Sequence, residues 1–123
     1  MGKYIREIDG VKYVGVVISP GFGAGWSTWN GLNPCDGEFI DFLLEKGTIY
    51  KGEDEDEEWR VRIDKNVVYD YWCYTRGYKD IFCDGVNDGF EIQWIKEGTL
   101  IRITEYDGAE SIEYLNSSGF FAV

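Results

Sequence analysis

Two Asp-Gly dipeptides, each set between two runs of β-prone residues, constrain the fold of this chain more than any other feature. The dipeptides are Asp9-Gly10 and Asp107-Gly108, and the runs are Lys3–Ile8, Val11–Ile18, Thr99–Tyr106 and Ala109–Leu115. Asp-Gly between such runs favours a two-residue turn, which fixes the residues of the two strands that face each other. The sequence therefore predicts two antiparallel hairpins. The nearly unbroken apolar end of Val11–Ile18 predicts that this strand lies inside a sheet.

The register of the second hairpin sets two glutamates directly opposite each other. Tyr106 faces Ala109, and the further pairs are Glu105 with Glu110, Thr104 with Ser111, Ile103 with Ile112, and Arg102 with Glu113. Arg102 and Glu113 are expected to form a cross-strand ion pair worth at most about 1 kcal/mol. Glu105 and Glu110 repel each other, and an arginine from elsewhere, the hydroxyl groups of a ligand, or solvent can offset this repulsion. If a ligand does so, Glu105→Gln should raise the melting temperature and weaken ligand binding.

Capping signals predict two helices. The first runs from Pro34 or Asp36 to Lys46, with Asn33 as its cap. Asp64 predicts the start of the second, over Lys65–Arg76. The side chains expected on the buried face of the second helix are Val67, Val68, Tyr71 and Trp72.

The other segments predict short strands and loops. The strands are expected at Thr48–Lys51, Trp59–Ile63, Tyr78–Cys83 and Phe90–Trp94. The acidic run Glu53–Glu58 is expected to be a solvated loop, and Asn116–Val123 a loose tail. The predicted fold class is therefore α+β, a mostly antiparallel β-sheet with two short helices, in a single domain spanning residues 1–123.

Composition excludes several classes of function. The chain has no histidine, which removes Ser-His-Asp and Cys-His catalysis and most zinc catalysis. Its formal net charge of −11 excludes a general nucleic-acid binder and argues against docking on an anionic membrane. No apolar run approaches the roughly 20 residues that span a bilayer, and the N-terminus lacks a signal-peptide core. The three cysteines show no Cys-x-x-Cys spacing, so reduced thiols in a cytosol are expected. We expect no catalytic residues, metal or cofactor.

The segment from Ser19 to Gly31 combines glycines, tryptophans and small polar residues. It matches neither the dinucleotide-binding glycine spacing nor a phosphate-binding loop. Trp26 and Trp29 have no periodic apolar pattern around them, so they are expected to lie outside the core. Aromatic faces stack on purines and arginines hold phosphates. Because the whole chain is acidic, an anionic ligand must be enclosed by local cations. The candidate cations are Arg60, Arg62, Arg76 and Arg102.

Two segments resemble the N-terminal and C-terminal signatures of phage anti-Thoeris proteins of the first type. The first is Gly-Phe-Gly-Ala-Gly-Trp-Ser-Thr-Trp-Asn at residues 21–30, which follows a short apolar strand. The second comprises residues 90–95, 97–99, 102–103 and 105–112. The length also matches over nearly the whole chain. The departures are the acidic insert at 53–58 and the N-terminal extension through Val11.

The resemblance implies that the protein is a sponge acting in the cytoplasm of an infected bacterium. The bacterial Thoeris system senses phage and makes a cyclic ADP-ribose isomer, which activates an NAD-depleting effector. Proteins of this family bind that isomer, glycocyclic ADP-ribose, tightly and without cleaving it. They work as homodimers with sites at subunit interfaces, and some assemble into hexamers that also bind cyclic oligonucleotides.

The candidate ligand-binding residues come from both signature segments and from the stretch before Phe90. They are Trp26, Ser27, Thr28, Trp29, Asn30, Phe82, Asp88, Arg102, Glu105, Tyr106 and Asp107. Trp26 or Phe82 is expected to stack on the adenine, and Arg102 to hold a phosphate. Hydrogen-bond donors are expected from Ser27, Thr28, Asn30 and the Gly23–Gly25 backbone. Acceptors for ribose hydroxyls are expected from Asp88, Glu105 or Asp107.

Two other classes of function compete with a sponge. A hydrolase acting on the same signal is disfavoured because the chain lacks histidine and a clustered acid set with metal spacing. An acidic interaction protein that inhibits a host protein is the second alternative. A sponge returns its ligand intact after heat denaturation, a hydrolase returns a product, and an interaction protein shows no thermal shift with a small molecule.

Overall fold

The computed structural model describes two antiparallel sheets and two helical segments over residues 2–21, 23, 25–51, 58–82, 89–114 and 120–123. In chain order the elements are β1 (Ile5–Ile8), β2 (Val11–Ile18), α1 (Gly37–Lys46), β3 (Thr48–Lys51), β4 (Glu58–Arg62), α2 (Lys65–Asp70), the π-helical turn η1 (Tyr71–Thr75), β5 (Phe90–Lys96), β6 (Leu100–Tyr106), β7 (Ala109–Glu113) and β8 (Phe121–Ala122). The predicted fold class, α+β with mostly antiparallel strands and two helices, is confirmed.

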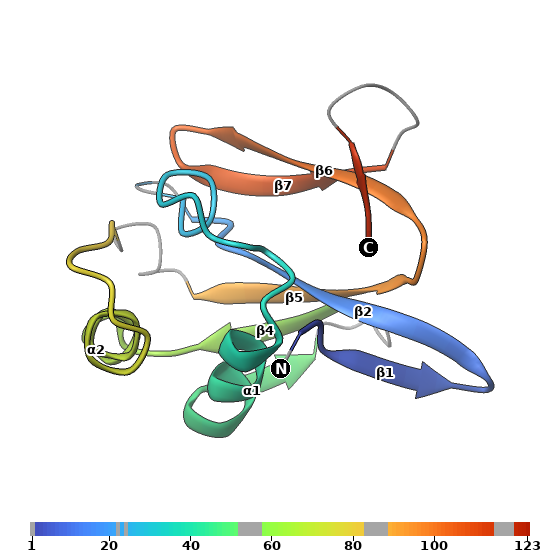
Figure 1. Ribbon diagram of the computed structural model, residues 1–123, viewed down its shortest axis with the longest axis horizontal. Helices are drawn as coiled ribbons and strands as arrows, with labels where there is room; N and C mark the ends of the chain where they lie inside the picture. The colour runs from blue at the N-terminus through green and yellow to red at the C-terminus, as the bar shows by residue number, and fades with distance from the viewer. Residues whose placement is uncertain (1, 22, 24, 52–57, 83–88, 115–119) are drawn as a thin grey trace.

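The larger sheet lies between the helices and the smaller sheet (Figure 1). Its strand order is β1-β2-β5-β4-β3, and the smaller sheet has the order β7-β6-β8. One core packs the α1 side chains Phe39, Ile40 and Leu43 with sheet residues such as Val17 and Ile92. A second core joins Val14, Val16 and Ile95 of the large sheet to Ile101 of β6 and Val123. Strand β2 is thus an inner strand with both faces covered, as its apolar pattern predicted.

Asp36 caps helix α1, and not Asn33 as expected. The Asp36 carboxylate accepts a hydrogen bond from the Phe39 N–H at 3.0 Å, which satisfies one of the free donors of the first turn. The Asn33 side chain instead accepts from the Cys35 N–H at 2.9 Å in the turn before the helix. Arg76, which follows η1, also pairs with Asp36, at 2.7 Å. This ion pair joins the start of α1 to the end of the second helical segment.

The second helical segment spans the predicted range but changes its winding. Residues 65–70 are α-helical and residues 71–75 are π-helical. Val68, Tyr71 and Trp72 are buried as expected, whereas Val67 is exposed. The prediction for Val67 was wrong because the segment packs through a narrower face than the apolar pattern suggested.

Both Asp-Gly hairpins form with the predicted register. Asp9, Gly10, Asp107 and Gly108 all have positive φ, which a two-residue turn of this type requires. All five pairs predicted between β6 and β7 are observed. Arg102 and Glu113 form the expected ion pair, at 2.8 Å.

Two expected segments differ from the structure. Residues 78–82 of the expected strand Tyr78–Cys83 are irregular, and Cys83 lies outside the described residues. The expected loose tail at 116–123 ends instead in β8, which pairs with β6 through Ala122 and Phe121. The Val123 side chain is buried in the second core, so apolar packing holds the last residue in place. Of the expected acidic loop at 53–58, residues 53–57 lie outside the described residues, and Glu58 is not in a loop but is the first residue of β4.

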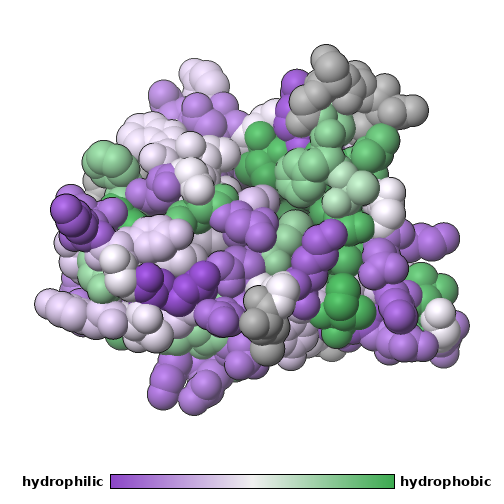
Figure 2. All heavy atoms as spheres, in the orientation of Figure 1, coloured by the Kyte–Doolittle hydropathy of each residue, from purple (hydrophilic) through white to green (hydrophobic). Residues whose placement is uncertain are grey.

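The surface seen in Figure 2 divides by hydropathy. Hydrophobic residues gather between β8 and β2, and hydrophilic residues dominate over α1 and α2. In the part of the chain that the structure describes, no helix is long and apolar enough to cross a membrane.

Candidate functional site

A buried glutamate on β7 holds the segment after β2 against the β6–β7 hairpin. Glu110 is 3% exposed and accepts six hydrogen bonds from the N–H and hydroxyl groups of Ser19, Ser27 and Thr28. The shortest two, from Thr28, are 2.8 Å long. The backbones are also joined, because the Glu110 N–H donates to the Ser19 carbonyl at 2.9 Å. We call this set of contacts, from Ser19, Ser27 and Thr28 to Glu110, the Glu110 clasp.

The glycines of the 21–30 segment allow this close approach. A Cβ atom on Gly25 would lie 2.9 Å from the Glu110 Oε2 and 3.0 Å from the Gly108 carbonyl, and it would also collide with the Thr28 hydroxyl. Gly23 has a φ of 121° and its N–H donates to the Asp107 carbonyl at 2.9 Å. The glycines expected to approach a ligand therefore approach the hairpin of the same chain.

Internal donors offset the charge of Glu110 in the Glu105–Glu110 pair, whereas Glu105 is also exposed to solvent, which was one of the three sources proposed from the sequence. Glu110 is satisfied by the clasp. Glu105 accepts from the Gly108 N–H at 2.8 Å and from the Trp29 indole N–H at 3.3 Å. The 21–30 segment and the turn thus supply the positive ends of N–H and O–H dipoles that the like-charge pair needs.

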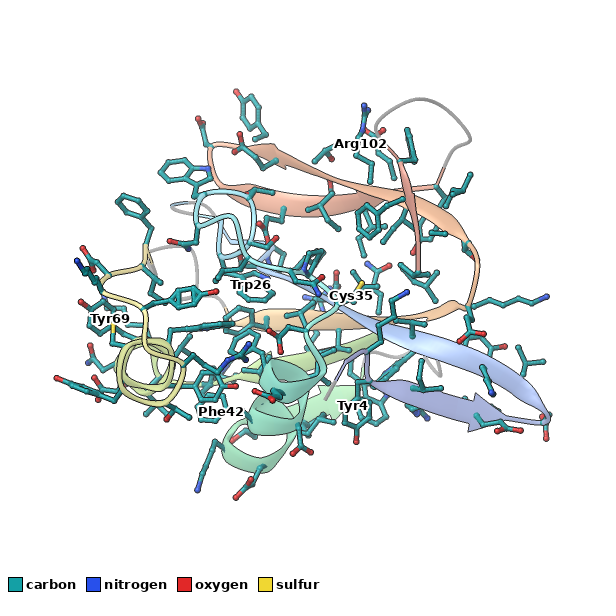
Figure 3. The ribbon with its side chains drawn as sticks, viewed as in Figure 1. Tyr4, Trp26, Cys35, Phe42, Tyr69 and Arg102 are labelled. Carbon is teal, nitrogen blue, oxygen red and sulfur yellow. The ribbon has the colours of Figure 1, made fainter. Side chains whose placement is uncertain are left out.

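Trp26 is a core residue, and the expectation that it lies outside the core was wrong. Its side chain is 2% exposed, and its indole N–H donates to the Val17 carbonyl at 3.0 Å. Its ring packs 4.5 Å from Phe39 and 5.9 Å from Trp72, between centroids. Figure 3 shows Trp26 in the middle of the molecule. No face of the ring is open for a base to stack on.

Ser27 and Thr28 use their donors within the protein. Both backbone N–H groups and both hydroxyls donate to Glu110. The expectation that these groups donate to a ligand is therefore not supported, because a ligand would have to replace a buried carboxylate.

Trp29 and Phe82, by contrast, form an exposed aromatic pair. The two side chains are 49% and 59% exposed, and their rings meet edge to face with centroids 6.3 Å apart. The Asn30 amide fixes this arrangement: it donates to the Phe82 carbonyl at 2.9 Å and accepts from the Phe82 N–H at 2.7 Å. Glu105 holds the other ring through the indole N–H. The edge-to-face geometry leaves ring surface available to a planar ligand, next to a carboxylate acceptor.

Two other candidates on the hairpin lie near this pair but face elsewhere. Tyr106 is exposed and follows Glu105 in β6, so its side chain points to the opposite face of the hairpin. Asp107 occupies the turn with a φ of 49° and contributes its carbonyl to Gly23. Asp88 lies outside the described residues.

Arg102 is also apart from the aromatic pair. It lies on the face of β6 opposite to Glu105, pairs with Glu113 at 2.8 Å and sits 4.9 Å over the Phe120 ring. Figure 3 places it at the far end of the hairpin from the 21–30 segment. The structure therefore brings together Trp29, Asn30, Phe82 and Glu105, but not the arginine chosen for phosphate.

Two of the other candidate arginines, Arg60 and Arg76, are bound to carboxylates elsewhere. Arg60 lies 3.6 Å from Glu91, and Arg76 binds both oxygens of Asp36. Burial raises the pKa of the Asp36 carboxyl, but hydrogen bonds from Arg76 and from the Phe39 N–H outweigh this and lower the pKa below its ordinary value. Arg76 is thus a structural cation. Arg60, Arg76 and Arg102 thus each have a carboxylate partner away from the aromatic pair.

Sequence reasoning missed Ser19 and Glu110. A signal for Glu110 was present, because the predicted register placed it on the same hairpin face as Ile103 and Ile112, where an acid must find donors.

Within the described ranges, no three His, Cys, Asp or Glu side chains are arranged to hold a metal ion.

Comparison of the chain with models of protein families, with curated proteins and with solved structures found no match.

Proposed function

We propose that the protein is a phage-encoded sponge that binds and sequesters glycocyclic ADP-ribose in the cytoplasm of an infected bacterium. It holds the signal without cleaving it and so blocks Thoeris signalling. The proposal rests on the resemblance of the 21–30 and 90–112 segments to the anti-Thoeris signatures. It needs no catalytic residue, metal or cofactor.

One observation carries the proposal: the two segments that bear the resemblance form one structural unit. About 60 residues separate the two segments in the chain, yet the Glu110 clasp and the bond between Gly23 and Asp107 hold them together. The exposed side chains at this junction include Trp29 and Glu105, which touch each other. A stacking surface beside a carboxylate suits the adenine and ribose parts of a nucleotide.

The phosphates require cations, and we propose that a second copy of the chain brings them. The resemblance implies homodimers, in some cases hexamers, with sites at subunit interfaces. Arg102 is exposed enough to reach a partner copy, since 44% of its side chain is accessible beside Glu113. A ligand phosphate would compete with that carboxylate for the guanidinium.

Calorimetry with glycocyclic ADP-ribose tests the proposal directly. The wild-type protein should bind the molecule and, after heat denaturation, release it unchanged in mass. Trp29→Ala should weaken binding about fivefold to 150-fold, since base stacking on an aromatic ring is worth about 1–3 kcal/mol. Tyr74→Ala is the matched control, because it removes an exposed aromatic ring from a different part of the surface. No binding by the wild type, or release of a cleaved product, would refute the proposal.

Arg102→Ala tests the phosphate role separately. This variant should melt within a few degrees of the wild type, because it removes only an exposed ion pair. If it binds the ligand as tightly as the wild type does, Arg102 holds no phosphate, and the sponge proposal must find another cation.

A further inference from the structure

The two helical segments present matching stripes of side chains to one groove. From α1 come Glu38, Asp41, Phe42 and Glu45, and from α2 and η1 come Val67, Asp70, Tyr71 and Tyr74. Both sets have the spacing i, i+3, i+4 and i+7, which places their members along one side of a helix. With Lys46 and Thr75 they line a cavity of about 480 Å³. A cavity of this size accommodates several side chains of a bound partner.

The floor of the groove is aromatic and firmly held. The rings of Phe42 and Tyr71 stack with centroids 4.1 Å apart and planes 24° from parallel. The Tyr71 hydroxyl accepts from the Arg76 guanidinium at 3.0 Å, and that guanidinium is itself fixed by Asp36. Figure 3 shows Phe42 between the two helical segments. The floor can therefore receive an apolar side chain without rearranging.

Apolar surface also extends up the walls. Tyr74 is 84% exposed and Val67 is 42% exposed, both on the α2–η1 side of the groove. The π-helical winding of η1 lies on this wall, and such turns are frequent at functional sites. Exposed apolar surface around a groove is typical of an interaction site.

The rim of the groove is strongly acidic. The lining carries four carboxylates and one ammonium group, which gives it a net charge of −3. Glu45 is near Lys46, at 3.6 Å, and Glu38 is near Arg76, at 3.6 Å. Asp41 and Asp70, one from each helical segment, make no ion pair or side-chain hydrogen bond with any residue that the structure describes. These two carboxylates are thus available to a cation.

We propose that this groove binds a basic amphipathic segment of a partner protein. An apolar side chain of that segment packs on the Phe42–Tyr71 floor, and its Lys or Arg residues meet Asp41 and Asp70. The carboxylates of α1 lie along the eight residues from Glu38 to Glu45, whose seven rises span about 10 Å of helix. A bound segment with cations at helical spacing matches this length.

Charge complementarity distinguishes this occupant from others. A small polyamine matches the carboxylates but leaves the aromatic floor without an apolar anchor. A second copy of this acidic chain, at a net charge of −11, would bring like charge to an acidic rim. A basic segment satisfies both the floor and the rim, and lysine or arginine over the exposed Tyr74 ring adds cation–π attraction.

The probe for this proposal is a synthetic peptide of leucine and lysine in helical spacing, labelled with a fluorophore. Its binding is measured by anisotropy at about 150 mM salt, where distant charges are screened. Because any cationic peptide is attracted to an acidic protein, the protein variants carry the test. Asp41→Asn with Asp70→Asn should weaken binding about tenfold, the sum of two partly exposed charge contacts. Glu7→Gln with Glu97→Gln removes the same charge at the far side of the large sheet and should weaken binding by less than about threefold.

Four further measurements complete the test. Tyr74→Ala should also weaken peptide binding, and amide shifts on titration should concentrate in α1, α2 and η1. Equal losses from the two charge pairs would overturn the proposal, because the attraction would then come from the overall field. Full displacement of the peptide by an equal concentration of spermidine would overturn it too, since a small cation would then suffice. Nucleotide binding should be unchanged in the Asp41 and Asp70 variant, so this proposal and the sponge proposal can fail independently.

Discussion

Replacing Glu110 by glutamine tests the Glu110 clasp. Oε2 accepts four of the six hydrogen bonds and Oε1 accepts the two from Ser19. A glutamine keeps one acceptor oxygen and replaces the other by an NH2 donor. If the oxygen takes the position of Oε2, the NH2 group points at the Ser19 N–H, which lies 3.0 Å away in the wild type. The glutamine NH2 group and the Ser19 N–H, both donors, then face each other where no water reaches them.

The expected loss of stability follows from these contacts. A buried donor without an acceptor costs about 1–3 kcal/mol, and the remaining hydrogen bonds weaken when their acceptor loses its charge. We therefore expect Glu110→Gln to lower the free energy of unfolding by about 2–4 kcal/mol. For a chain of this size that corresponds to a melting temperature about 6–20 °C lower.

Glu105→Gln is the matched control, because Glu105 faces Glu110 in the same register. Its carboxylate is exposed, and the bonds from Gly108 and Trp29 both go to one oxygen, which a glutamine can reproduce. Relief of the like-charge pair adds about 0.2–1 kcal/mol of stability. We expect the unfolding free energy of this variant to lie within about 1 kcal/mol of the wild type. Thermal and urea melts of both variants check this, and equal destabilisation by the two changes would refute the assignment of Glu110 as the anchor.

Three other perturbations are specific. Gly25→Ala should destabilise the protein by about 1–3 kcal/mol in urea melts, because its Cβ displaces the Thr28 hydroxyl or the Glu110 carboxylate; a neutral result would show that the segment can shift away. The lowered pKa of Asp36 means that its stabilisation is present above the ordinary Asp pKa of 3.8 and is lost as the pH falls below it. Thermal melts between pH 7 and pH 3 should therefore show a smaller loss for Asp36→Asn than for the wild type, and parallel curves would contradict this. Burial raises the pKa of the Cys35 thiol to about 11, so in a Cys83→Ser background iodoacetamide at neutral pH should modify Cys73 well before Cys35, as mass spectrometry can show.

The elements that local chemistry decides were predictable from the sequence. The two Asp-Gly turns set the hairpins and the register of β6 and β7 to the residue, because a two-residue turn leaves no choice of partner. The extent of both helical segments followed from caps and stops. The exposed Val67 and the irregular stretch after residue 77 were not predictable in this way, because tertiary packing overrides local propensity there.

The candidate site was less predictable, because a glycine- and tryptophan-rich segment is compatible with both ligand binding and internal docking. Trp26, Ser27 and Thr28 looked like ligand contacts, yet each is committed to the core or to Glu110. The two outcomes differ in whether the donors of this segment have an acceptor within the chain. That acceptor is Glu110, which lies about 80 residues away in the sequence, so the sequence alone does not show that the donors are occupied.

The Glu110 clasp also bears on what a shared signature can mean. In the 21–30 segment, the glycines, Ser27 and Thr28 serve the attachment to the hairpin, and Trp26 fills the core. Chains that share these residues are expected to share the attachment, whatever ligand they hold. The side chains left over are those that face solvent at the junction, chiefly Trp29, Phe82 and Glu105. Ligand choice in such a fold must then depend on these exposed positions and on what a partner copy adds. If the protein is the sponge that we propose, exchanging the two aromatic residues (Trp29→Phe with Phe82→Trp) should change which cyclic nucleotide is bound and leave the melting temperature nearly unchanged, whereas changes in the clasp should do the reverse.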